Sequence, residues 1–209
     1  AIAVDPGTVG NGTSQSARLN LRRELVVVSG LLQWAVDGKL MIANRGTAST
    51  PIDFAKTAYD EDQPQLVIRV PENITIIPIY LEVVLEDSAG TDTEVIWSFT
   101  TNDIGNGTST AVAPVNARVG GPGSSCTVRR DYTGNATAAT GLTEMGRFLY
   151  AFADATGNPA KIDKWSINDR PPVVLVGDAS LQLHIVGGTT APAGFVTAVW
   201  AEFASSQLG

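Results

Sequence analysis

Hydrophobic and polar residues alternate along much of this chain, and turn-forming residues interrupt the pattern at short intervals. In residues 93–101, TEVIWSFTT, Val95, Trp97 and Phe99 alternate with polar neighbours, which is the period of a half-buried β-strand. Similar short apolar runs recur between segments rich in Gly, Pro, Asn and Asp, and no long stretch has a helical period. This spacing predicts an all-β protein with about ten strands, arranged as an antiparallel β-sandwich or barrel.

Two local patterns give sharper predictions. Asp37-Gly38 lies between the apolar runs LLQWAV (31–36) and KLMIAN (39–44), and this dipeptide favours a tight β-hairpin. The long run ITIIPIYLEVVLED (74–87) contains Pro78, which cannot donate a hydrogen bond to a neighbouring strand. The sequence therefore predicts a hairpin at residues 31–44, and a bulge or an edge position at Pro78.

The chain is expected to form one domain preceded by an arm. Residues 1–20, AIAVDPGTVGNGTSQSARLN, are small and polar without periodicity, so they are interpreted as an extended N-terminal arm. Residues 21–209 are assigned to a single domain, because a β-sandwich often reaches about 200–250 residues in one domain.

Composition and charge narrow the choice of partners. The chain has 209 residues, of which only 17% are charged, and its formal net charge is −7. Non-specific binding to nucleic acid depends on Lys and Arg, so strong direct nucleic-acid binding is not expected. No apolar run approaches the ~20 residues that span a bilayer, so no membrane span is expected. A surface this poor in charge is easier to explain if copies of the chain cover much of it, although the abundant Thr and Ser residues also suit exposed strands.

Two long segments carry a resemblance to a known class. The segments VVLVGDASLQLHIVGGTTAPAGFVTAVWAEF (173–203) and QLVIRVPENITIIPIYLEVVLEDSAGTDTEVIWSF (65–99) resemble the closing and middle strands of single jelly-roll virion proteins. The resemblance covers residues 65–203 and is one of pattern. It implies that the domain of residues 21–209 is a single jelly-roll domain, an antiparallel β-sandwich of jelly-roll type. It implies a capsid or capsid-associated protein that is located in the virion and self-assembles as a homo-oligomer, a trimer or higher. Its partners would be copies of itself and other virion proteins.

The same segments are also similar to trimeric jelly-roll modules of the tumour-necrosis-factor type. The alternative is therefore a trimeric binding module outside the cell or at its surface, such as a fibre head, an adhesin or a carbohydrate-binding domain. Its contact surface would be the loops at residues 102–110 and 133–146. One departure from many capsid proteins of small RNA viruses is the absence of a strongly basic arm.

The candidate interface residues come from the arm and from the loops. Arg18, Arg22 and Arg23 are the basic residues near the arm, and Asn106 and Asn135 lie in two predicted loops. These five residues are predicted to contact other subunits. No residue is assigned a catalytic, cofactor-binding or metal-binding role, and no cofactor is expected.

The residue types that support catalysis are scarce. His184 and Cys126 are the only residues of their kinds, whereas zinc sites and nucleophile–base pairs need several such groups. Cys126 is expected to be a buried thiol, and His184 to face solvent or an interface, on the opposite side of its strand from Leu183. Trp34, Trp97, Trp165 and Trp200 are assigned to the core.

Carboxylates are the remaining candidates for enzymatic chemistry or ion binding. The pairs considered are Glu82 with Glu86 and Asp60 with Asp62, together with Glu94. Loop oxygens of Asn102, Asp103 and Asn106, or of residues 60–62, could supply part of a calcium site. Solvated acidic groups and unliganded turns are the expected state, so the protein is interpreted as a structural or binding protein and not as an enzyme.

Overall fold

The computed structural model describes residues 18–19, 25–26, 30–47, 50–54, 58–87, 92–150, 161–187 and 192–207. The chain divides into two compact units, Ala1–Gln33 and Trp34–Gly209, and the helix α1 (Gly30–Val36) spans their boundary. In the first unit, β1 (Arg18–Leu19) and β2 (Leu25–Val26) form an antiparallel pair. The candidate residue Arg18 lies in β1 opposite Val26, whereas Arg22 and Arg23 lie outside the described residues.

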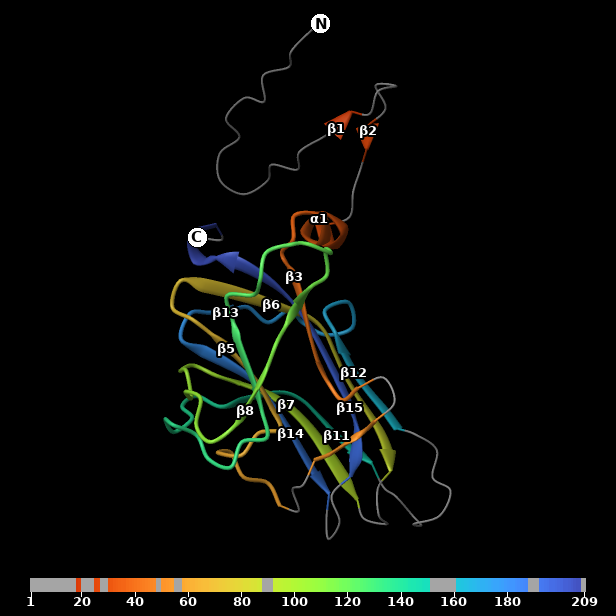
Figure 1. Ribbon diagram of the computed structural model, residues 1–209, viewed down its shortest axis with the longest axis vertical. Coiled ribbons are helices and arrows are strands. Elements are labelled where there is room, and N and C mark those ends of the chain that lie inside the picture. Colours follow the sequence, from red (N-terminus) through yellow and green to blue (C-terminus); the bar gives the residue numbers. More distant parts are fainter. Residues whose placement is uncertain are drawn as a thin grey trace, which may run out of the picture. The chain divides into compact units, whose positions relative to one another are not determined.

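The second unit consists of two antiparallel sheets packed face to face (Figure 1). The seven-stranded sheet has the order β12 (Lys161–Ser166), β6 (Ile74–Asp87), β15 (Ala193–Ala204), β3 (Leu40–Arg45), β9 (Val115–Asn116), with β13 (Leu175–Val176) beside β6 and β4 (Ile52–Asp53) beside β15. The six-stranded sheet has the order β11 (Thr143–Tyr150), β7 (Thr93–Thr100), β14 (Ala179–Gly187), β5 (Leu66–Val70), β10 (Thr127–Arg130), β8 (Thr110–Val112). A short 3-10 helix, η1 (Ser205–Gln207), follows β15. The predicted all-β antiparallel sandwich is confirmed.

The pairing of the longer strands follows a simple rule. Eight of the described strands have five or more residues, in chain order β3, β5, β6, β7, β11, β12, β14 and β15. The first pairs with the eighth, the second with the seventh, the third with the sixth and the fourth with the fifth. The third also pairs with the eighth and the fourth with the seventh. A long eight-stranded hairpin that is rolled into two sheets produces this order.

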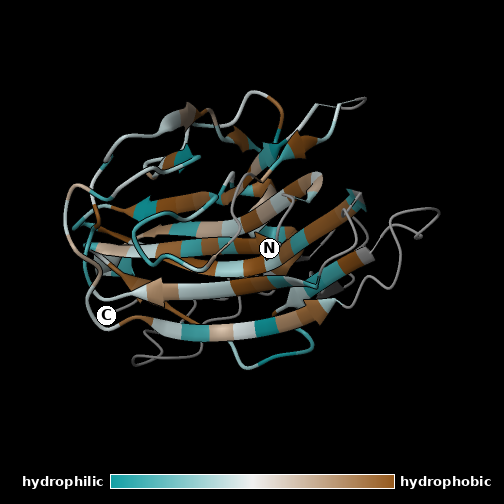
Figure 2. Ribbon diagram, turned by 90° about the horizontal axis from the view of Figure 1, so that it is seen from below, coloured by the Kyte–Doolittle hydropathy of each residue, from teal (hydrophilic) through white to brown (hydrophobic). Residues whose placement is uncertain are grey.

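The core lies between the two sheets and follows the period-two alternation of the strands. Side chains from both sheets form one cluster of buried apolar groups, which includes Trp97, Trp165 and Trp200 at no more than 1% exposure. The prediction that these three tryptophans belong to the core is confirmed, while Trp34 lies half-buried in α1. Figure 2 shows the alternation as bands of hydrophobic and hydrophilic residues along the strands.

The predicted hairpin at residues 31–44 is wrong in its first half, where the chain forms the helix α1 instead of a strand. Gly38 has a φ of 70°, its N–H donates to the Ala35 carbonyl at 3.1 Å, and the Lys39 N–H donates to the Trp34 carbonyl at 2.8 Å. These two bonds form a Schellman motif, in which a left-handed glycine ends a helix. An Asp-Gly pair suits both a tight hairpin and a helix end, so the local signal was ambiguous.

The predicted bulge at Pro78 is confirmed. On β15, Val199 pairs with Tyr80 and the next residue, Trp200, pairs with Pro78, so Ile79 is an extra residue on β6. The bulge lets a strand of 14 residues keep its pairing with β15 on both sides of a proline that has no N–H to donate.

Candidate functional site

The outward face of the six-stranded sheet is covered by loops of the chain itself. Val67 on β5 points away from the main core, and it packs against Ile104 and Tyr132 from two separate loops. All three side chains are fully buried. Ile104 lies in the loop after β7, and Tyr132 lies in the loop after β10. Because both side chains are buried against Val67, the two loops pack on the sheet and form a layer over its outward face, which is called the loop layer below.

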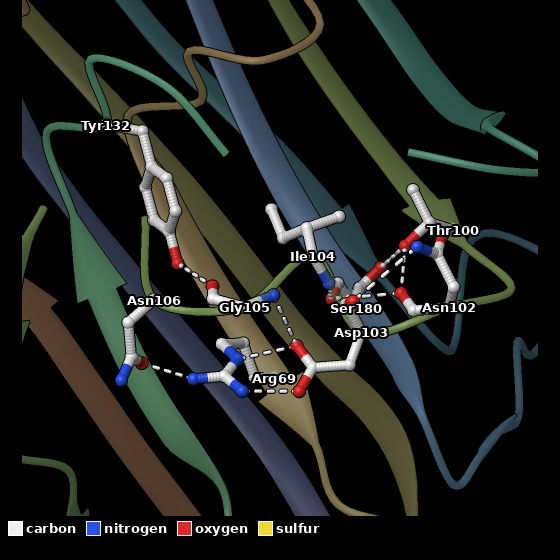
Figure 3. A network of polar contacts seen from close by, with 9 residues as sticks. All are labelled: Arg69, Thr100, Asn102, Asp103, Ile104, Gly105, Asn106, Tyr132 and Ser180. Atoms are coloured by element: carbon white, nitrogen blue, oxygen red, sulfur yellow. Dashed lines mark hydrogen bonds and ion pairs between the residues drawn. The ribbon is translucent and has the colours of Figure 1, made fainter. Parts of the chain in front are cut away.

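A polar network holds the first of these loops on the sheet (Figure 3). The Arg69 guanidinium on β5 binds both carboxylate oxygens of Asp103, with Nε donating to Oδ1 at 2.6 Å and Nη2 donating to Oδ2. Its third nitrogen, Nη1, donates to Oδ1 of Asn106. The Gly105 N–H donates to Asp103 at 2.9 Å, and the Tyr132 hydroxyl donates to the Gly105 carbonyl at 2.9 Å. One arginine thus fixes the path of the loop at residues 103–106.

The network also sets the charge state of its members. Burial alone would raise the pKa of Asp103, but the hydrogen bonds from Arg69 and Gly105 and the charge of Arg69 outweigh it and lower that pKa. The hydrogen bond to Asp103 raises the pKa of Arg69 in turn. A bidentate guanidinium–carboxylate pair has a fixed planar geometry, so it orients the loop as well as neutralising the charges.

A second contact joins the two loops to each other. The Asn102 side chain donates from Nδ2 to the Ala138 carbonyl at 2.9 Å and accepts the Thr140 N–H at Oδ1 at 2.8 Å. The oxygens of Asn102, Asp103 and Asn106 that were considered as calcium ligands therefore already accept hydrogen bonds within the layer. Over the described residues, no group of three or more His, Cys, Asp or Glu side chains could hold a metal ion.

The two predicted interface residues in the loops have partners within the chain. Asn106 is exposed, and its carboxamide oxygen accepts from Arg69. Asn135 is half-buried, and its Nδ2 donates to Oδ1 of Asp62 at 3.0 Å, which ties the second loop to the segment before β5. Both residues therefore lie in the loop layer. Of the two, Asn106 has its side chain at the surface, where another molecule could reach it.

The expectation that His184 faces solvent or an interface is wrong. Its side chain does lie on the opposite face of β14 from Leu183, but the residue is only 1% exposed. The ring of Tyr59 covers it, with ring centroids 5.0 Å apart. Burial lowers the pKa of His184 to about 4, although the backbone of Glu61 and the charges of Asp60 and Glu144 act in the opposite direction. Sequence periodicity identified the face correctly but could not show that another segment covers it.

Two polar side chains near His184 in the same sheet are buried as well. Gln182 on β14 and Ser98 on β7 are direct cross-strand partners, and both are at most 1% exposed. Neither the Gln182 carboxamide nor the Ser98 hydroxyl has a hydrogen-bond partner among the described residues. Buried polar groups without partners are costly, so this part of the layer is less well satisfied than the part around Arg69.

The candidate acidic pairs are engaged in separate local contacts. Glu82 accepts the Tyr80 hydroxyl at 2.5 Å and lies 3.2 Å from the Lys164 ammonium. Glu94 pairs with Arg147 at 2.6 Å. Asp60 accepts the Asp62 N–H at 3.0 Å and so forms a turn in the segment before β5, while Glu86 is exposed near the end of β6.

Three buried residues with charged side chains, Glu202, Asp163 and Arg45, were not predicted from the sequence. Glu202 is 6% exposed and accepts hydrogen bonds from the Trp200 indole at 2.8 Å and the Ser125 N–H at 2.8 Å. Asp163 is 2% exposed and points to the core side of β12, as Trp165 does. Arg45 is 2% exposed and pairs with Asp131. For Asp163, the alternation with Trp165 was a usable signal.

The predicted burial of Cys126 is confirmed, since the residue is 6% exposed. Burial, together with the nearby carboxylate of Glu202, raises the pKa of its thiol. A thiol with a raised pKa is a poor nucleophile at neutral pH, because the thiolate is the reactive form.

No protein-family model matches the chain, and no curated protein sequence matches it. The longest helix in the part of the chain that the structure describes is α1, with seven residues, so none of these helices could cross a membrane.

Proposed function

We propose that this chain is a virion structural protein, a capsid or capsid-associated subunit of jelly-roll topology that assembles through repeated contacts with copies of itself. The observation that carries the proposal is the rolled-hairpin pairing order, first strand with eighth through fourth with fifth. Double-sheet jelly rolls of eight strands are a recurrent architecture of viral capsid domains. The resemblance of residues 65–203 to virion proteins supports the same function.

The surface chemistry supports a role in packing. Only 17% of the residues are charged, and the loops over the six-stranded sheet are tied down by internal hydrogen bonds. A subunit of this kind presents a surface of fixed shape, so little conformational entropy is lost when it packs against a neighbour. Copies of the chain and other virion proteins are its expected partners. Strong direct binding to nucleic acid is not expected, because the chain carries a net charge of −7 and would be repelled by the phosphates.

Light scattering on the purified chain during size-exclusion chromatography, with negative-stain images of the leading fraction, tests the proposal. Closed shells, tubes or other large regular oligomers are the expected result. The measurement should cover high and low salt and a range of pH, because assembly contacts of an acidic protein depend on screening. A chain that stays monomeric at high concentration under all of these conditions would overturn the proposal.

One observation favours a second candidate, a trimeric binding module. The Arg69 network holds the exposed Asn106 in one position, as a preformed contact residue on a binding loop would be held. A discrete trimer that binds defined glycans on an array would support this function. Loss of that binding in an Asn106→Ala variant, with the trimer intact, would assign the binding to this loop.

A further inference from the structure

The outward face of the seven-stranded sheet carries apolar side chains at positions where a sheet that faces water usually carries polar ones. Antiparallel sheets that face water on one side usually alternate apolar inward residues with polar outward ones. The inward residues of its central strands are buried as expected, for example Leu81 on β6 and Ala198 on β15 at 0% exposure. Several of the outward residues between them are apolar as well: Ile42, Tyr80, Val84, Phe195 and Val199.

The apolar side chains form continuous rows across neighbouring strands. In one row Val115 pairs with Ile42, Ile42 with Val199 and Val199 with Tyr80. Val115 ends this row at the edge strand β9 and is 55% exposed. Side chains that are direct cross-strand partners touch one another, so each row is a continuous apolar strip.

A second strip runs parallel to the first, two rows further along the strands. Phe195 pairs with Val84, and Val84 pairs with Ile162 on the opposite edge strand, β12. Ile162 is 53% exposed. Contiguous apolar surface of this kind on a protein marks an interaction site more often than an accident of sequence.

One end of the face is closed by the chain itself. Trp34 packs edge-on against Phe203 on β15, with ring centroids 5.2 Å apart. The Lys39 ammonium lies 5.8 Å from the centre of the same ring, and Ala201 beside it is fully buried. The open part of the face therefore begins beyond Ala201, at the row that contains Val199.

A polar row separates the two apolar strips. Its members are successive cross-strand partners: Asn44, Thr197, Glu82 and Lys164. The two charges in the row neutralise each other, since Lys164 Nζ lies 3.2 Å from the Glu82 carboxylate. The middle of the face is thus neutral although the chain carries a net charge of −7. Two acidic copies would repel each other least at such a place.

We propose that this face is an interface between two copies of the chain, related by a two-fold axis that runs parallel to the strands between β6 and β15. The proposal rests on the proposed function, for which it supplies one of the subunit contacts. Such an axis keeps each row opposite the same row of the second copy and exchanges β6 with β15 and β12 with β3. Sheets pack face to face about 10 Å apart, which is the spacing at which these side chains interdigitate.

The two-fold axis makes the polar row complementary to itself. Lys164 faces Asn44 of the second copy, so the ammonium can donate to a carboxamide oxygen. Glu82 faces Thr197 of the second copy and can accept from its hydroxyl. No like charges oppose each other, and Tyr80 faces Val199 in the neighbouring apolar strip. An isologous interface requires self-complementarity of this kind.

A charged substitution in the middle of the apolar strip tests the location of the interface. Val199→Lys places an ammonium opposite Tyr80 of the second copy, and we expect sedimentation velocity to show self-association weakened at least about tenfold. The matched control is Leu149→Lys on β11, a residue of the other sheet that is 62% exposed. Circular dichroism should show both variants folded. Equal self-association of Val199→Lys and the control would overturn the proposal.

A pair of substitutions at one exposed position tests the two-fold register, and it leaves the fold untouched. Asn44 is exposed, and its cross-strand partner on β15 is the neutral Thr197. Asn44→Glu places a carboxylate opposite Lys164 of the second copy and should tighten association about threefold at low salt. Asn44→Lys should weaken it by a similar factor. Overall charge alone predicts the opposite order, because Glu makes an acidic chain more acidic, so that order would overturn the register.

The outcomes separate this inference from the proposed function. Particles that form equally well from wild-type protein and Val199→Lys would reject this interface and leave the virion role standing. A dimer that Val199→Lys disrupts, but that never grows into regular particles, would support the interface and reject the virion role. A wild-type chain that is monomeric at all concentrations would reject both.

Discussion

The Tyr59 ring covers the His184 imidazole, with their centroids 5.0 Å apart and their planes inclined at 46°. His184 is the only histidine in the sequence, and it is 1% exposed on the loop-covered face of the six-stranded sheet. The covering segment turns at Asp60, whose carbonyl accepts the Gln63 N–H at 3.1 Å. A single buried imidazole under a short cover gives this protein a defined response to acid.

Acid should destabilise the fold through His184. Burial lowers the pKa of His184 in the folded state to about 4, whereas the unfolded chain binds the proton near the ordinary value of 6.5. The free energy of unfolding should therefore fall as the pH drops below about 6.5, by up to about 3 kcal/mol near pH 4. Urea denaturation across this range measures the slope, and His184→Gln, which cannot be protonated, should remove this contribution.

The imidazole also reports its own environment. Because there is one histidine, its ring resonances can be followed by NMR without ambiguity during a pH titration. Tyr59→Ala opens the cover and should raise the pKa of His184 toward 6.5, while Tyr80→Phe on the other sheet serves as the control. An imidazole that already titrates near 6.5 in the wild-type protein would show that the cover is open in solution.

Asp163 should produce the opposite response to pH. Burial raises the pKa of Asp163 to about 7, although the Lys164 N–H, the charge of Arg170 and the Trp97 indole lower it. A carboxyl whose pKa is raised by folding binds its proton more tightly in the folded state. Its contribution to the free energy of unfolding is therefore present in acid and is lost as the pH rises from about 4 to about 7.

Asp163→Asn should raise the free energy of unfolding by about 1–3 kcal/mol near pH 8 and change it little near pH 4, because the carboxamide is neutral at both. The exposed Asp169→Asn is the control, with no expected effect at either pH. Since His184 and Asp163 act in opposite directions between about pH 4 and 6.5, the wild-type profile is partly flattened, and the two single variants are needed to separate them. Destabilisation by Asp163→Asn at pH 8 would contradict the prediction.

The strands were predictable because their signal is local. The alternation of Val95, Trp97 and Phe99 defines β7, and Pro78 predicts the bulge that lets β6 run through a proline. The helix α1 was missed because seven residues are too few to establish a helical period against a hairpin signal at Asp37-Gly38. The pairing of strands far apart in the chain cannot be obtained from such local patterns.

The polar contacts were much less predictable, because their partners are distant in the sequence. Arg45 pairs with Asp131, 86 positions away, and no pattern around either residue indicates that the guanidinium is buried. The burial of His184 depends on a cover from another segment, which the alternation in β14 does not reveal. Asn106 and Asn135 were correctly placed in loops, but their partners Arg69 and Asp62 were not identified.

Glu202 should be a large contributor to stability. Its carboxylate accepts from the Trp200 indole and the Ser125 N–H, each at 2.8 Å, and from the Ser124 hydroxyl, so it ties the loop at residues 120–126 to β15. Glu202→Ala leaves a buried indole N–H without a partner and should lower the free energy of unfolding by about 2–4 kcal/mol. Glu202→Gln keeps an acceptor oxygen and should cost less, and the exposed Glu86→Ala should cost almost nothing.

The Arg69–Asp103 pair should control the order of the loop at residues 101–109. Asp103→Ala removes the acceptor for two guanidinium nitrogens and for the Gly105 N–H. It should speed hydrogen exchange in this loop while the amides of β5 and β7 stay protected, and lower the free energy of unfolding by about 1–2 kcal/mol.

Two further variants test which contacts of the Arg69 guanidinium matter. Arg69→Lys should have the same effect as Asp103→Ala, because an ammonium cannot bind the carboxylate through a planar fork. Asn106→Ala removes a single contact of the same guanidinium and should have a smaller effect. If all three variants leave exchange in the loop unchanged, the hydrophobic contacts of Ile104 and Tyr132 hold the loop without the ion pair.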